Sequence, residues 1–165
     1  MIIMGTEQNF GRRKCRFLIW IFPLVIAIMI FSFSAQPGDD SAQLSDRFVQ
    51  VFLHVRDQVG LFPHLSETEV VHLFSVLVRK SAHVTEYLLL CISLHISFYV
   101  TEVKDQIRIL SAFLLTFGYA CTDELHQLFV PGRAGLFTDV LIDSSGAFVL
   151  CIILFIRMYL KQKTQ

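Results

Sequence analysis

The segment ILSAFLLTFGYACTDELHQLFV, residues 109–130, decides the fold of this chain. Its first two thirds are mostly apolar, and its last third carries Asp123, Glu124, His126 and Gln127. A helix of about 20 apolar residues is long enough to cross a bilayer. Charged groups within such a helix are costly unless they face water or other polar groups. The segment therefore predicts a membrane helix whose polar end contributes to an internal site.

Three further stretches of this kind predict membrane helices at about residues 17–34, 81–100 and 139–160. The composition agrees, because 54% of the 165 residues are hydrophobic and only 17% are charged, with a mean hydropathy of +0.59. Soluble domains usually carry more charge. We expect an all-α polytopic membrane protein, a four-transmembrane-helix bundle that forms a single domain over residues 1–165. The formal net charge of zero argues against binding of nucleic acid.

Basic residues indicate the orientation of the helices, since Lys and Arg favour the cytoplasmic side of a membrane. Nine of the 14 precede the first helix, link the second to the third, or end the fourth: Arg12, Arg13, Lys14, Arg16, Lys104, Arg108, Arg157, Lys161 and Lys163. The other five fall on the opposite side: Arg47, Arg56, Arg79, Lys80 and Arg133. We therefore expect a multi-pass protein of the bacterial cytoplasmic membrane with both termini in the cytoplasm.

An alternative interpretation makes the first apolar stretch a signal peptide. It follows basic residues, and Ser32-Phe33-Ser34 before Ala35 weakly resembles a small-residue cleavage site. Cleavage would leave three helices and remove one wall of the polar cluster described below, so we favour a membrane helix.

The loop between the first two membrane helices, about residues 38–78, is predicted to be external and to contain amphipathic helices. Apolar residues recur in it at helical spacing: Leu44, Phe48, Val51, Phe52, Val55 and Val59. This pattern predicts a helix on the outer membrane surface. Ser66 and Glu69 have the spacing of a capping box, which predicts a second helix start. That helix can continue past Arg79 into the membrane.

Polar residues of the membrane helices concentrate at one end of the predicted bundle. Because the helices alternate in direction, all of these residues fall in the outer half of the membrane. The candidate catalytic residues are His83, Glu86, Asp123, Glu124 and His126. The candidate substrate-binding residues are Arg79, Lys80, Tyr87, Gln127, Arg133, Ser34 and Gln36. Asp139 and Asp143, one helical turn apart, are candidate ligands for a divalent metal such as Mg²⁺.

Several roles are compatible with this cluster. It could be the active site of an enzyme that acts on a lipid-linked substrate, or a site that binds or shields a lipid headgroup, a cell-wall precursor or an antibiotic without chemistry. A carrier is a third possibility, although the inner halves of the helices lack such groups. Buried ion pairs could also simply fix the pairing of helices. A zinc site from His83, Glu86, Asp123 and His126 has suitable ligand types, but the sequence requires no cofactor.

Four motifs in order resemble the signatures of the VanZ-like family. They are Ser32–Pro37, Arg79–Tyr87, Asp123–Arg133 and Asp139–Gly146. The third is the most specific, an Asp-Glu-x-His-Gln run followed by Pro-Gly-Arg. The resemblance covers about residues 30–150, and the long external loop departs from it.

The VanZ-like family is named for a protein linked to resistance against teicoplanin, a glycopeptide that binds cell-wall precursors. The resemblance therefore implies a bacterial membrane protein of the cell envelope. It also implies partners such as a membrane lipid or a lipid-linked cell-wall precursor, but it gives no reaction.

Overall fold

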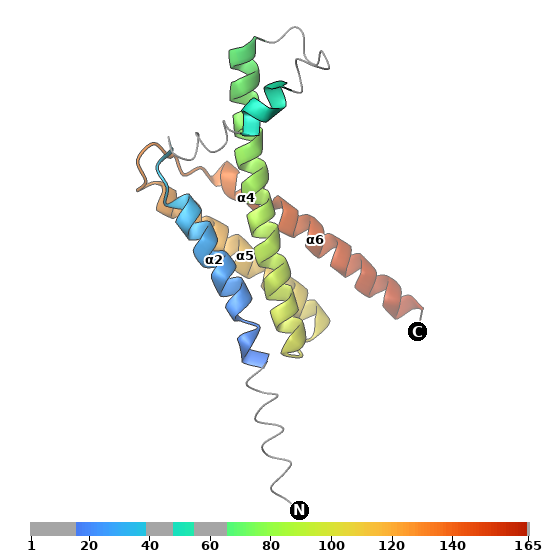
Figure 1. The fold of residues 1–165 in the computed structure, drawn as a ribbon. Coiled ribbons are helices and arrows are strands. Elements are labelled where there is room, and N and C mark those ends of the chain that lie inside the picture. Colours follow the sequence, from blue (N-terminus) through green and yellow to red (C-terminus); the bar gives the residue numbers. More distant parts are fainter. Residues whose placement is uncertain (1–15, 39–47, 55–65, 165) are drawn as a thin grey trace, which may run out of the picture.

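A computed structural model describes residues 16–38, 48–54 and 66–164 of the chain, and these residues form helices joined by short turns (Figure 1). The main elements are α2 (Ile21–Ser34), α4 (Glu67–Val100), α5 (Asp105–Gln127) and α6 (Phe137–Lys163). A shorter helical segment covers residues 48–54. The predicted all-α class is confirmed for the described part of the chain.

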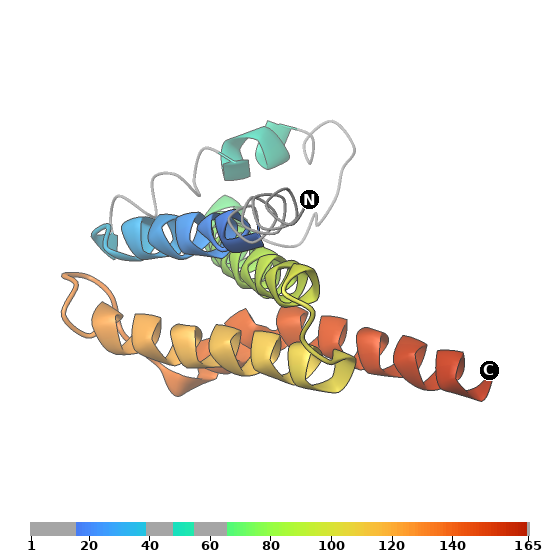
Figure 2. The same cartoon turned by 90° about the horizontal axis from the view of Figure 1, so that it is seen from below.

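The helix α4 is the central element of the bundle, because it packs against α2, α5 and α6. Viewed from below, α2 and α4 form one layer, while α5 and α6 form the other (Figure 2). The helices alternate in direction, so α2 begins and α6 ends at the same end of the bundle as the α4–α5 turn (Figure 1). The polar ends of all four helices therefore meet at the opposite end.

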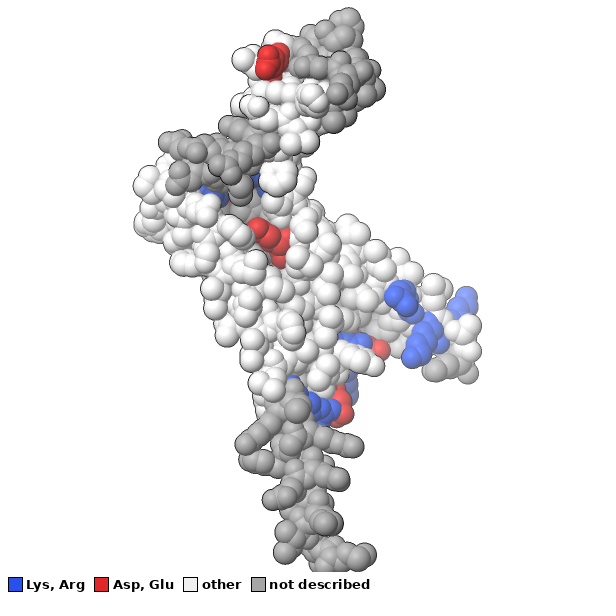
Figure 3. Space-filling model, in the orientation of Figure 1, with Lys and Arg blue, Asp and Glu red and all other residues white. Residues whose placement is uncertain are grey.

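Three of the described helices are long and apolar enough to cross a membrane: Arg16–Ser34, Glu67–Val100 and Phe137–Lys163. The helix α5 has 23 residues, but the polar residues of its last turns make it less apolar. The crossing predicted at residues 109–130 therefore remains a prediction. Between the two ends of the bundle the visible surface is mostly uncharged, and basic residues gather where α6 ends (Figure 3).

The start of α4 is defined by the predicted capping box. The Ser66 hydroxyl accepts a hydrogen bond from the Glu69 backbone N–H at 3.3 Å, and the Ser66 N–H donates to Glu69 Oε2 at 2.9 Å. From there the helix runs unbroken for 34 residues, or roughly 51 Å. The hydrocarbon core of a bilayer is about 30 Å thick, so α4 is longer than one crossing requires. Its first turns project beyond α2 and α5 (Figure 1).

The helical segment 48–54 packs on this projecting part of α4. The Phe52 and Phe74 rings stack with centroids 3.7 Å apart, and Val49 and Val70 are both buried. The predicted amphipathic helix is thus helical where it is described, and its apolar face contacts α4. The rest of that prediction falls on residues 39–47 and 55–65, which lie outside the described residues, as do the basic residues 12–14.

Small residues allow the central helices to approach closely. A Cβ atom placed on Gly146 of α6 would lie 3.1 Å from Val84 Cγ1 and 3.3 Å from the Val84 carbonyl oxygen of α4. Ala112, Ala120 and Ala147 are fully buried in the same core. Small residues at such contacts are typical of helix packing in membranes. Close packing of α4 against α6 fixes the polar side chains that these two helices present near their ends.

Candidate functional site

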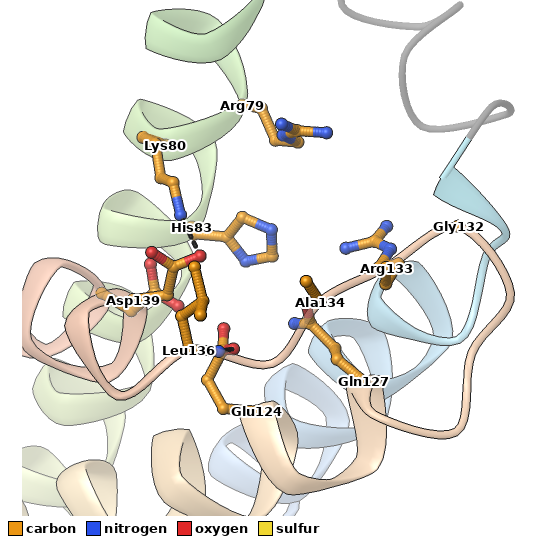
Figure 4. A pocket seen from close by; sticks show the side chains of 11 residues that line it. Arg79, Lys80, His83, Glu124, Gln127, Gly132, Arg133, Ala134, Leu136 and Asp139 are labelled. Carbon is orange, nitrogen blue, oxygen red and sulfur yellow. Dashed lines mark hydrogen bonds and ion pairs between the residues drawn. The ribbon is translucent and has the colours of Figure 1, made fainter.

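A cavity of about 370 Å³ lies at the polar end of the bundle, between α4, the end of α5, the loop that follows it and the start of α6 (Figure 4). We call it the polar cavity. It is lined by Arg79, Lys80, His83, Glu124, Gln127, Gly132, Arg133, Ala134, Leu136, Asp139 and Asp143. Eight of these 11 residues are candidate site residues from the sequence.

Helical spacing explains how three elements supply these side chains. Residues three or four apart lie on one face of a helix. Arg79 and His83 are four apart on α4, Glu124 and Gln127 are three apart on α5, and Asp139 and Asp143 are four apart on α6. Each helix thus turns one polar face toward the polar cavity.

Lys80 and Asp139 form an ion pair that joins α4 to α6. Both side chains are largely buried, with 25% and 19% of their surfaces exposed. The pair neutralises both charges at the edge of the polar cavity (Figure 4). Asp139, a predicted metal ligand, is therefore already engaged by an ammonium group.

Glu124 holds the loop that leads into α6. Its Oε2 accepts a hydrogen bond from the Leu136 backbone N–H at 2.9 Å, and Leu136 is the residue that caps α6. A carboxylate is favourable beside the start of a helix, where backbone N–H groups are exposed. Glu124, which the sequence predicts to be catalytic, thus has at least one positioning contact.

Arg133 connects the polar cavity to the end of α2. Its Nε donates to the Gln36 carbonyl at 3.0 Å, and its Nη2 donates to the Phe33 carbonyl at 3.2 Å. Burial lowers the pKa of the Arg133 guanidinium, and the positive charge of Arg79 acts in the same direction. The carboxylates of Asp123, Glu124 and Glu86 oppose this shift. The two guanidinium groups are therefore close enough to repel each other.

Arg79 makes no hydrogen bond or ion pair within the described residues. Its side chain and that of Arg133 lie on one side of the polar cavity, with His83 between them and the acidic side (Figure 4). Guanidinium groups bind carboxylates and phosphates through paired N–H donors. Because no carboxylate of the described chain occupies Arg79, this side of the polar cavity suits an anionic group.

The His83 imidazole is the titratable ring that projects into the polar cavity (Figure 4). Its Nδ1 lies 3.8 Å from Glu86 Oε2, which is an electrostatic contact but too long for a hydrogen bond. No acceptor for Nδ1 is present among the described residues. The pair has the composition of a general base and its orienting carboxylate, without their usual hydrogen bond.

Several predicted site residues lie behind the polar cavity rather than on its surface. Asp123 is buried, and its Oδ2 accepts a hydrogen bond from Gln127 Nε2 at 3.1 Å. Tyr87 and Ser34 are fully buried, and in the described part of the chain Asp123 Oδ1 and both hydroxyl groups have no hydrogen-bond partner. His126 packs against the Phe31 ring, with centroids 4.6 Å apart.

The zinc hypothesis is wrong for the described residues. No group of three or more His, Cys, Asp or Glu side chains within residues 16–38, 48–54 and 66–164 is arranged to hold a metal ion. Three of the four proposed ligands have different neighbours, and only His83 and Glu86 contact each other. His83 lines the polar cavity, Asp123 holds Gln127, and His126 packs on Phe31.

The backbone groups of the site have no signature in the sequence. Gly132, Ala134 and Leu136 line the polar cavity, and Gln36 serves Arg133 through its carbonyl rather than its side chain. A backbone carbonyl carries no residue-specific signal. Such contacts depend on which loops meet in space.

The residues that line the polar cavity lie within the region that defines a known family. The family model of VanZ/LLP1 matches residues 18–158, which include every residue that lines the polar cavity. The chain belongs to the VanZ/LLP1 family. This confirms the resemblance seen in the four sequence motifs, and it agrees with the membrane-spanning character of the helices. No curated protein and no solved structure matches the chain.

Proposed function

We propose that this VanZ/LLP1 protein binds the anionic headgroup of a membrane lipid or lipid-linked cell-wall precursor in the polar cavity. The observation that carries the proposal is the Arg79 guanidinium, which has no carboxylate partner among the described residues and lies on the same side of the polar cavity as Arg133 (Figure 4). Two half-buried guanidinium groups that repel each other are both stabilised when a phosphate lies between them. The ligand would thus supply the negative charge that no described carboxylate brings to Arg79.

The placement of the polar cavity in the membrane supports a lipid headgroup as the ligand. Asp143 is six positions after the first residue of α6, or roughly 9 Å along the helix. If α6 begins at the outer surface, as the basic residues predict, the cavity lies at the depth of the headgroups. The exposed apolar surfaces of α2 and α6 would face the acyl chains. A role in the cell envelope, linked to glycopeptide resistance, is consistent with this placement.

An enzyme is a second candidate, and the contact between His83 and Glu86 is the observation that favours it. His83 would act as general base or acid on a group held by Arg79, and Glu86 would orient the ring. The separation of 3.8 Å would have to shorten when substrate binds. Binding and catalysis would take place in the same cavity, so its location does not distinguish them. They differ in whether His83 is indispensable in addition to Arg79.

The first test measures lipid binding by purified protein. Native mass spectrometry would compare retention of phosphatidylglycerol with that of uncharged diacylglycerol for the unmodified chain, Arg79→Gln and the control Lys161→Gln. Lys161 is an exposed cation at the far end of α6. We expect Arg79→Gln to reduce phospholipid retention about tenfold, which is the loss of one charged hydrogen-bonding group. Equal retention by all three proteins would contradict the proposal.

A second measurement separates binding from catalysis. Teicoplanin resistance of a sensitive bacterial host would be measured with Arg79→Gln and with His83→Gln, together with the amount of folded protein. If the function is binding, Arg79→Gln should abolish any resistance that the protein confers, and His83→Gln should retain most of it. Loss with both variants at unchanged protein levels would favour an enzyme.

A further inference from the structure

The charges around the polar cavity are balanced and separated, which an anion site alone does not explain. Arg79, Lys80 and Arg133 supply three cations, and Glu124, Asp139 and Asp143 supply three carboxyl groups. With the Lys80–Asp139 pair set aside, two guanidinium groups and two carboxyl groups remain in the lining of the polar cavity. A site that bound only phosphate would gain nothing from the carboxyl groups, which repel an anion.

Asp143 is the carboxyl group that most needs a partner. Only 1% of its surface is exposed, it lines the polar cavity, and its Oδ1 has no hydrogen-bond partner among the described residues. A buried polar group without a partner is destabilising, because it has lost its hydrogen bonds to water. Carboxyl oxygens accept hydrogen bonds, and an ionised carboxylate accepts only. A donor from outside the chain would remove that cost.

We propose that the polar cavity selects headgroups that carry a hydrogen-bond donor beyond their phosphate, with the phosphate at Arg79 and Arg133 and the donor at Asp143. This inference rests on the proposed function, and it narrows the substrate class. The donor is an amine, as in an ethanolamine ester, or a hydroxyl, as in a glycerol or sugar ester. Headgroups without such a donor are rejected because they leave Asp143 buried and unpaired.

Two phospholipids of the same charge test this selection. Phosphatidylethanolamine and phosphatidylcholine share a phosphate and a cationic nitrogen, but only the first can donate a hydrogen bond. We expect native mass spectrometry in mixed micelles to show about tenfold higher retention of phosphatidylethanolamine, as one hydrogen bond to a charged group predicts. Phosphatidylglycerol in the same mixture shows whether a hydroxyl serves in place of the amine. Retention of phosphatidylethanolamine above phosphatidylcholine supports the proposal, because these two lipids have the same net charge. Phosphatidylglycerol has a net negative charge, so its retention supports the proposal only if Asp143→Leu lowers it relative to phosphatidylcholine.

The variant Asp143→Leu separates selection by hydrogen bonding from selection by size. Leucine has the same branched arrangement of heavy atoms as aspartate but accepts no hydrogen bond, and removing an acceptor that has no partner leaves no other buried group unpaired. Asp143→Leu should therefore keep phosphate binding and lose the preference for donor lipids. Asp105→Asn, at the opposite end of the bundle, is the control and should retain that preference. If Asp143→Leu does not fold, Asp143→Asn should still lower the preference for the amine.

The outcomes distinguish this inference from the proposed function. Equal retention of all three phospholipids, together with sensitivity to Arg79→Gln, would overturn the inference and leave the anion site standing. Unchanged selectivity in folded Asp143→Leu would also overturn it. Retention of phospholipids no greater than that of diacylglycerol would overturn both.

Discussion

Arg133 Nε, in the loop after α5, donates a hydrogen bond at 3.0 Å to the carbonyl of Gln36, which lies 97 positions earlier and just beyond the end of α2. The same guanidinium reaches the Phe33 carbonyl and lines the polar cavity. A side chain that binds α2 also forms part of the candidate ligand site. Ligand binding and the position of α2 are therefore expected to depend on each other.

Replacing Arg133 by Lys should loosen the end of α2 while it keeps the charge. An ammonium group lacks the planar fork that serves two carbonyls at once, so we expect a loss of about 1–2 kcal/mol in the free energy of unfolding. Thermal unfolding in detergent measures this loss. Arg157→Lys, on an exposed position of α6, is the control and should leave the melting temperature unchanged. Equal stability of both variants would show that the contacts to α2 contribute little.

Gly38 and Gly132 form a close backbone contact that a methyl group would disrupt. The Gly38 N–H donates to the Pro131 carbonyl at 3.2 Å, and a Cβ on Gly38 would collide with the Gly132 carbonyl oxygen. Because the obstacle is backbone rather than a flexible side chain, Gly38→Ala should cost about 1–3 kcal/mol. Gly132→Ala should also destabilise the protein, since Gly132 has a φ of +74°.

Gly118 provides the matched control for these two substitutions. Nothing lies within 4 Å of a Cβ placed on Gly118, in the interior of α5. Gly118→Ala should therefore leave the melting temperature unchanged or raise it. The higher helix propensity of alanine can add up to about 1 kcal/mol to the free energy of unfolding. Similar losses for all three alanine variants would refute a specific role for the contact between Gly38 and Gly132.

The Lys80–Asp139 pair should show energetic coupling between α4 and α6. Either single change, Lys80→Met or Asp139→Asn, leaves a largely buried partner without its counterion. The double variant removes both charges and should recover part of the loss. We expect a coupling energy of about 1–2 kcal/mol in a double-mutant cycle by thermal unfolding, reduced by partial exposure to solvent. Strictly additive losses would mean that the two groups do not interact in solution.

Ser66→Ala should unravel the first turn of α4 and leave the bundle intact. Loss of the cap typically costs about 1 kcal/mol, and it acts on the first turn of α4, whose N–H groups the Ser66–Glu69 box satisfies. Hydrogen exchange at residues 67–71 should accelerate, while the rest of α4 stays protected. Thr85→Ala removes a hydroxyl that only bonds its own helix, at the Ser81 carbonyl, and should not change exchange at these residues.

The sequence by itself determined the helices and the end of the bundle at which the polar residues meet. Length and hydropathy fix a membrane helix locally, because the bilayer requires about 20 apolar residues regardless of what surrounds them. The capping box at Ser66 is also local, since it is completed within four residues. The zinc grouping failed because it combined residues of two helices, α4 and α5, whose mutual distances no spacing along the chain encodes.

Only the tertiary structure decided which polar residues are free to bind a ligand. Arg79 and Lys80 are neighbours in sequence with the same charge, yet Lys80 is paired with Asp139 while Arg79 is unpaired in the described chain. Adjacent positions of a helix point about 100° apart, so the two side chains meet different neighbours. Asp123 and Glu124 differ in the same way, as one holds Gln127 and the other the start of α6. The partner of each polar side chain depends on which neighbouring helix packs beside it, and the order of residues along one helix does not specify that neighbour.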